Sequence, residues 1–206
     1  MRRIFNLAVL FLIIGVFKVL GLVIGLFAKK HPPSQHLDDT LRLYRRGPEG
    51  TEFAWFYEID DRIYVDRGKL GEMAARRDVD IEDWPGIEAE IDALRTDGFG
   101  ELDEEAWQFV QIVYEVKDGF ASGDELAKRN AVTDILDEHF ALTGQGFWID
   151  SSSGMGTAEF GFLVVDYEIA RESIVAKLAG TEFADYLAIR DTDTLATADD
   201  IRAEAT

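Results

Sequence analysis

The chain has 206 residues, 47% of them hydrophobic and 30% charged, which is typical of a folded protein rather than a disordered one. It carries 21 basic and 40 acidic residues, a formal charge of −19, and such an acidic surface repels phosphate backbones and argues against nucleic-acid binding. The absence of cysteine excludes disulfides, thiolate nucleophiles, zinc–thiolate sites and iron–sulfur clusters.

The first element is an apolar run over residues 4–28, in which Lys18 is the one charged residue. A helix of this length, at about 1.5 Å per residue, is roughly 37 Å long and can cross a hydrocarbon core of about 30 Å. We therefore predict a single-pass transmembrane helix, with a cleaved signal peptide or a buried core helix as the alternatives. Gly21 and Gly25 form a GxxxG pattern, which either permits close packing of two membrane helices or is incidental.

Basic residues flank both ends of this run. Arg2 and Arg3 precede it, and Lys29 and Lys30 follow it. The tendency of basic flanks to stay in the cytoplasm favours a domain on the cytoplasmic side. Because both flanks are basic, and because long domains can be translocated regardless of charge, the opposite orientation stays open.

Residues 29–50 resemble a stalk or linker, because they contain Pro32-Pro33 and the turn-rich Gly47-Pro48. We expect the globular domain to span residues 51–190. Its first part, residues 51–66, is aromatic and β-branched around a turn, and predicts a β-hairpin.

Two helices are expected next, a short one over residues 69–77 and a better defined one beginning at Trp84-Pro85. Proline suits the first turn of a helix. The second helix is also indicated by apolar residues spaced at i, i+4 and i+7, namely Ile87, Ile91 and Leu94.

Residues 107–190 show alternating strand and helix patterns in the order β-α-β-β-α-β. This order resembles the ferredoxin-like topology, a four-stranded antiparallel sheet with two helices on one face. The fold class is thus α+β. Residues 191–206 are acidic and are expected to be frayed or a short surface helix. The expected elements are a strand at 110–116, a helix at 124–142, a strand at 147–149, a loop at 150–157, a strand at 160–165, a helix at 168–178 and a strand at 186–189.

The expected loop at 150–157 is the candidate ligand site. Its hydroxyls and flexible backbone N–H groups can cradle an anion. It has no lysine and lacks the spacing of a P-loop. The alternative, which we favour, is a hairpin connection that contains serine and glycine because turns prefer them. The candidate residues are Asp150, Ser151, Ser152, Ser153, Gly154 and Gly156.

The sequence predicts no metal site, no cofactor and no catalytic set. His139 is the one histidine in the expected globular domain, near a helix C-terminus that favours it without catalysis. The leading hypothesis is a membrane-anchored, non-enzymatic interaction or regulatory domain that binds a protein partner, which includes the case of a homodimer. The alternative is a small-ligand or anion-binding domain, or a catalytic one, that uses the 150–157 loop with Asp166 or His139.

Overall fold

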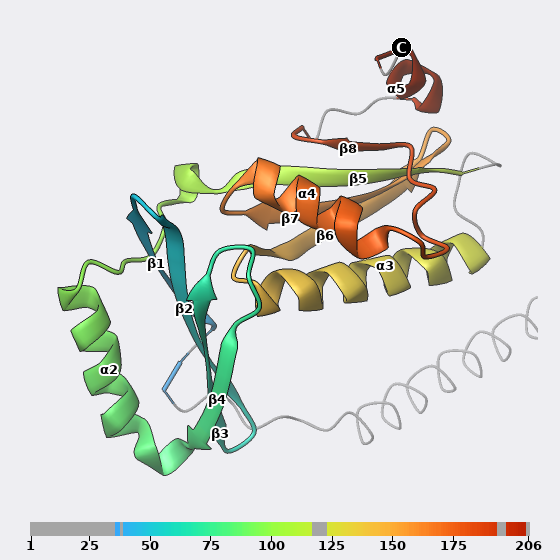
Figure 1. Cartoon of the computed structure of the whole chain (residues 1–206). Helices are drawn as coiled ribbons and strands as arrows, with labels where there is room; N and C mark the ends of the chain where they lie inside the picture. The colour runs from blue at the N-terminus through green and yellow to red at the C-terminus, as the bar shows by residue number, and fades with distance from the viewer. Residues whose placement is uncertain (1–35, 38, 117–122, 193–196, 205–206) are drawn as a thin grey trace, which may run out of the picture. The chain divides into compact units, whose positions relative to one another are not determined.

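The computed structural model describes residues 36–37, 39–116, 123–192 and 197–204, all within one unit of the chain (Figure 1). The predicted transmembrane helix at 4–28 and its basic flanks lie outside the described residues. Among the helices that the structure does describe, none is long and apolar enough to cross a membrane.

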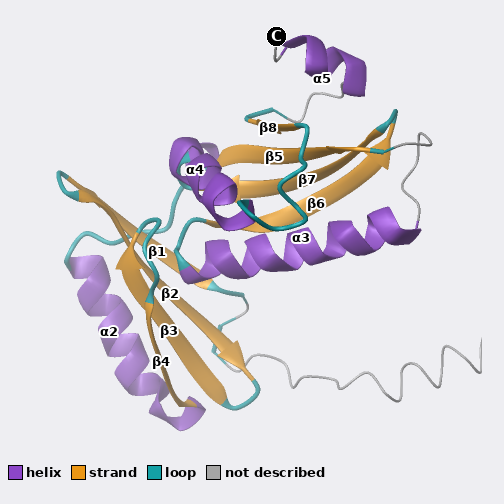
Figure 2. Ribbon diagram, turned by 45° about the vertical axis from the view of Figure 1, so that its right-hand side comes forward, coloured by secondary structure: helices purple, strands orange, loops and turns teal. Residues whose placement is uncertain are grey.

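The described residues form an α+β structure with two four-stranded antiparallel sheets and four α-helices (Figure 2). Sheet A has the strand order β1-β2-β3-β4, and sheet B has the order β6-β7-β5-β8. We call sheet A with α2 the first module, and sheet B with α3 and α4 the second module.

Sheet A is a meander covered on one face by α2. Leu43, Phe56 and Val65 point to that face and are at most 1% exposed. They pack against the apolar stripe of α2, as its sequence spacing predicts. The hairpin predicted over 51–66 and the helix predicted from Trp84 are therefore confirmed. The bounds are β1 Leu41–Gly47, β2 Gly50–Ile59, β3 Arg62–Lys69, β4 Ala75–Asp80 and α2 Trp84–Thr96.

Two predictions for this part of the chain are wrong. Residues 41–47 are not linker but strand β1, in which Leu43 is fully buried beside β2. Residues 69–77 are not a helix, because β3 runs to Lys69 and β4 begins at Ala75. Both errors have one cause. Strands β1 and β4 are rich in arginine and have no clear apolar pattern of their own, and pairing with a neighbouring strand holds them in place.

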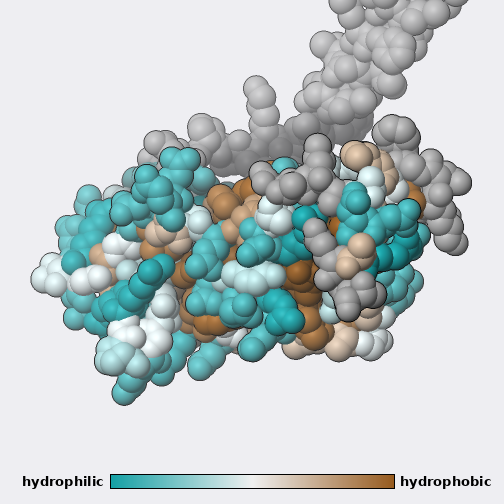
Figure 3. All heavy atoms as spheres, turned by 90° about the horizontal axis from the view of Figure 1, so that it is seen from above, coloured by the Kyte–Doolittle hydropathy of each residue, from teal (hydrophilic) through white to brown (hydrophobic). Residues whose placement is uncertain are grey.

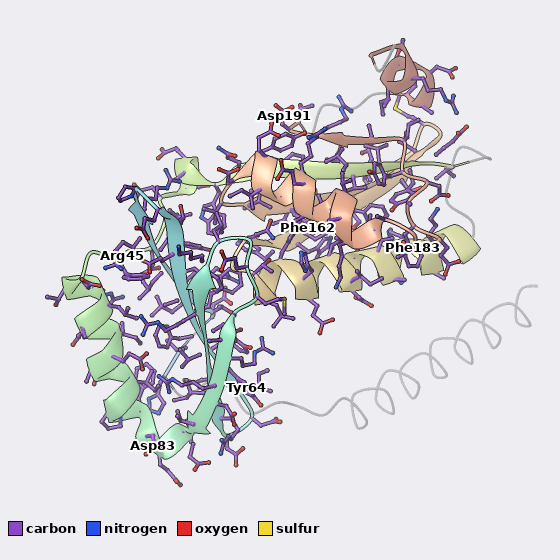
Figure 4. All side chains as sticks on the ribbon, in the orientation of Figure 1. Arg45, Tyr64, Asp83, Phe162, Phe183 and Asp191 are labelled. Carbon is purple, nitrogen blue, oxygen red and sulfur yellow. The ribbon has the colours of Figure 1, made fainter. Side chains whose placement is uncertain are left out.

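Sheet B carries α3 and α4 on the same face, and the predicted order β-α-β-β-α-β is present. Phe140 of α3 and Ile174 of α4 pack with Phe162 of β7 in one core; Figure 4 labels Phe162 beneath α4. The acidic tail contains a short helix, α5. The bounds are β5 Gln108–Glu115, α3 Gly123–Leu142, β6 Gly146–Gly154, β7 Thr157–Val164, α4 Tyr167–Leu178, β8 Ala188–Arg190 and α5 Ala198–Glu204.

The loop predicted at 150–157 is mostly strand. β6 continues through Gly154, and only Met155 and Gly156 connect it to β7. Both turn residues have positive φ, 55° and 85°, as a two-residue type I′ hairpin turn requires. Serine and glycine favour turns, so the local sequence did not reveal this strand, whose pairing with β7 holds it in place.

The two modules meet at the connection between α3 and β6. The Tyr44 hydroxyl donates to the Gly144 carbonyl oxygen at 3.2 Å, and the Gly71 N–H donates to the Thr143 oxygen at 3.0 Å. Gly144 has a φ of +65°, and a Cβ there would clash with the buried ring of Phe53. Only glycine adopts this positive φ without strain and also leaves room for the Phe53 ring.

Candidate functional site

Strand pairing separates the predicted site residues onto two faces of sheet B. Asp150 and Ser152 lie opposite Gly161 and Glu159 of β7, on the face away from α3 and α4. Ser151 and Ser153 alternate to the helix side. The six candidates therefore do not form one cradle. We call the face away from the helices the outer face.

A strip of hydrogen-bond acceptors crosses the outer face, which we call the acceptor strip and define as Gln111, Asp150 and Glu159. Gln111 pairs with Gly161 in register, and Gly161 pairs in turn with Asp150. Glu159 lies two residues before Gly161 on the same strand and therefore on the same face. Three neighbouring strands thus each contribute one side chain.

Gly161 makes room at the centre of this strip. A Cβ at that position would clash with the Asp150 carboxylate and would lie 2.9 Å from the ring of Phe109. The absence of a side chain on β7 thus lets the carboxylate from β6 lie across the sheet. The glycine inside an otherwise apolar strand is a local signal of this close approach.

The carboxylate of Glu159 is 5% exposed and is held by two hydroxyls. The Ser152 hydroxyl donates to one oxygen at 2.8 Å, and the Thr157 hydroxyl lies 3.1 Å from the other and 2.9 Å from the Gly154 carbonyl oxygen, so these two acceptors share its one proton. Among the described residues Glu159 forms no ion pair, and Asp150 has no hydrogen-bond or ion-pair partner. A buried carboxylate without a cation carries an uncompensated desolvation cost.

Gln111 adds an unmet acceptor. Its side chain is 6% exposed, and its Oε1 receives no hydrogen bond from the residues that the structure describes. A buried polar atom without a partner is uncommon in folded proteins and calls for an explanation. The strip therefore presents acceptors and negative charge, which suit a cation or another hydrogen-bond donor. This chemistry is less suited to an anion, which was the alternative that the sequence left open for the 150–157 segment beside a plain hairpin connection.

Helix α5 lies beside the hairpin end of the outer face. Arg202 forms an ion pair with Glu115 of β5 at 2.5 Å. The Ala198 side chain lies 3.9 Å from the position that a Cβ on Gly156 would take, and Ile201 is 2% exposed. The tail that the sequence predicts to be frayed or a surface helix is a helix that packs through two small apolar contacts.

The two other residues named with the 150–157 segment lie elsewhere. Asp166 caps α4, because its carboxylate accepts from the Ile169 N–H at 3.0 Å. His139 lies on the helix side, with its Nε2 2.6 Å from the Ser173 hydroxyl oxygen. The sequence did not reveal that pair, since 34 residues separate its members.

The described part of the chain contains no group of three or more histidine or acidic side chains placed to hold a metal ion. Beside Gly161, a charged residue within an apolar strand, Glu159 next to Phe160, is a signal that could have located the strip from sequence. No protein-family model matches the chain, and neither a curated protein nor a solved structure matches it significantly.

Proposed function

We propose that the protein is a membrane-anchored interaction or regulatory domain that docks a basic segment of a partner protein on the acceptor strip. Residues 4–28 are the anchor, and the domain faces the cytoplasm. In this proposal the second module is a ferredoxin-like unit. The observation that carries the proposal is that the exposed carboxylate of Asp150 and the nearly buried carboxylate of Glu159 have no cation among the described residues, next to the unmet acceptor of Gln111.

The charge of the domain supports a basic partner. Residues 36–206 contain 16 basic and 40 acidic residues, so the net charge is 16 − 40 = −24. A field of this sign attracts lysine- and arginine-rich segments and accelerates their encounter. The face seen in Figure 3 is predominantly hydrophilic with smaller hydrophobic areas between. A second copy of the chain is a poorer occupant, because two bodies of −24 repel each other.

The arrangement of the second module also supports docking on the outer face. Its two helices cover the opposite face and share one apolar core with the sheet. The strand order β6-β7-β5-β8 with both helices on one side supports the ferredoxin-like assignment, although the topology itself names no ligand. On the outer face Asp150 and Ser152 are exposed, whereas Gln111 and Glu159 are at most 6% exposed, so a partner would first meet the β6 side of the strip.

Titration of the full-length protein in detergent with a lysine-rich peptide, (Lys-Thr)₄, tests this proposal by calorimetry. We expect binding that weakens as salt rises, since exposed charges are screened. We also expect that the double variant Asp150→Asn/Glu159→Gln weakens it by at least about tenfold, or 1.4 kcal/mol. Asp83→Asn is the matched control, because Asp83 is an exposed acid of the first module. Equal affinity of the double variant and this control would refute the acceptor strip as the docking site.

A further inference from the structure

A hydrogen-bond network includes His139 on the helix side of sheet B. The Gln145 amide nitrogen lies 2.8 Å from the Thr143 hydroxyl oxygen and 3.0 Å from the Ser173 hydroxyl oxygen. Thr143 lies 2.7 Å from the His139 carbonyl oxygen, and Ser173 lies 2.6 Å from His139 Nε2. The network joins α3, α4 and the start of β6.

These contacts suit a base at His139. With the Gln145 amide nitrogen on the side of Thr143 and Ser173, the Thr143 hydroxyl donates to the His139 carbonyl oxygen and accepts from that nitrogen, and Gln145 Oε1 is left buried without a partner among the described residues. That nitrogen donates to the Ser173 oxygen, and the Ser173 hydroxyl proton is left to point at Nε2 of His139. The imidazole is then neutral, with its proton on Nδ1.

This pair faces solvent at the contact between the two modules. A surface depression is lined by His139, Ser173 and Lys177, with Gly71 and Ile169 on its sides. Burial, with a smaller contribution from the Lys177 ammonium, lowers the pKa of His139 below its usual value. The imidazole therefore stays an unprotonated base at neutral pH. Ser173 and Lys177 are four residues apart on α4 and so share one face of the helix.

We propose that Ser173 is a nucleophile activated by His139, and that the depression admits small activated esters. The Ser173 oxygen forms a bond to the ester carbonyl carbon while its proton passes to Nε2 of His139. The carbon–oxygen bond to the leaving group breaks, and the leaving alkoxide takes that proton. Water then attacks the acyl group with His139 as base, which releases the acid and restores the serine hydroxyl. Lys177 is the cation nearest to the developing oxyanion.

Labelling of the full-length protein with an alkyl fluorophosphonate tests the proposal, because only an activated serine displaces its fluoride at a useful rate. Peptide mass mapping should place the adduct on Ser173 and not on Ser151, a half-buried serine without a histidine partner. His139→Gln should slow labelling by about 100-fold or more, the usual contribution of a general base. The labelling rate should also fall as pH falls through the lowered pKa of His139.

Two outcomes would overturn the proposal. One is the absence of an adduct on Ser173 in a protein whose circular dichroism and unfolding midpoint are intact. The other is labelling of Ser173 at the same rate in wild type and in His139→Gln, which would make the histidine contact purely structural. Neither result bears on peptide docking, since the acceptor strip lies on the opposite face of the sheet.

Discussion

Residues 36–107, which hold the first module and its flanks, contain nine basic and 21 acidic residues. Residues 108–206 contain seven basic and 19 acidic residues, so each half has a net charge of −12. In the first half most arginines pair with acids, mainly on neighbouring strands or on α2. On the outer face of the second module the carboxylates of Asp150 and Glu159 have no such cation among the described residues. The paired arginines are Arg45, Arg62, Arg67, Arg76, Arg77 and Arg95.

Equal net charge therefore hides two different arrangements. Cross-strand pairs hold β4, which has almost no apolar residues, onto sheet A. The carboxylates on sheet B that have no cation among the described residues gain no stability from ion pairing. Charged groups left without a partner in this way are expected where a surface binds something. Substitutions at Gly144, on which both modules depend, and at the charged residues of each sheet should separate the two arrangements.

Gly144→Ala should break the contact between the modules and produce the largest effect. A Cβ at φ +65° strains the backbone by about 1–3 kcal/mol, and the clash with Phe53 adds about 1–3 kcal/mol more. Urea unfolding of the full-length protein in detergent measures the loss. Gly180→Ala is the control, because Gly180 has a φ of +73° but open space around it and so shows the strain alone. Equal losses in the two variants would mean that the packing against Phe53 contributes nothing.

Asp66→Asn and Glu159→Gln should separate the two arrangements of charge. Asp66 is fully buried and accepts two hydrogen bonds from Arg76, each of 2.7 Å. Removing its charge should cost about 1–3 kcal/mol, because Arg76 is partly exposed and can regain water. Glu159→Gln keeps both hydroxyl contacts and removes an unpaired charge, so it should change stability by less than about 1 kcal/mol. A larger loss for Glu159→Gln, measured in the same urea series, would contradict the comparison.

The same contrast explains what the sequence could predict of the fold. The helix from Trp84 and the core of sheet B follow from local periodicity, and both are present. Strand β1 was missed because its arginines conceal the alternation of Leu41 and Leu43. The guanidinium of Arg42 in fact lies over the Phe147 ring, 4.4 Å from its centroid, a contact between distant segments that no local pattern reveals.

The candidate site could be predicted only in part, for a related reason. Asp150 and Ser152 were singled out from sequence, but as members of a loop that binds anions. Strand pairing brings Asp150 next to Glu159 and Gln111. Glu159 is nine residues away from Asp150 in the sequence, and Gln111 is 39 residues away. Charge sign at a site is a property of the assembled face, so a short segment rich in serine and glycine could not supply it.

The stability of the second module should depend on pH through His139. In the unfolded chain this histidine has its ordinary pKa of about 6.5, and in the folded protein burial lowers that pKa. As pH falls through 6.5 the unfolded chain binds more protons than the folded one, so the free energy of unfolding falls. The difference between wild type and His139→Gln, followed from about pH 7.5 to about pH 5, isolates this contribution. A difference that is constant over this range would show that the histidine titrates normally when folded.

Arg202→Gln should produce the smallest effect, because it removes an exposed ion pair between α5 and Glu115. Exposed pairs add little to global stability, so the urea midpoint should not move measurably. The helix has only seven residues, so its local opening should become easier when this contact is lost. Hydrogen exchange of the Ile201 amide should then accelerate while that of Ile112, in the centre of β5, stays unchanged. Exchange that accelerates equally at both amides would instead place α5 within the cooperative core of the second module, and the outer face would then not be open to a partner at its hairpin end.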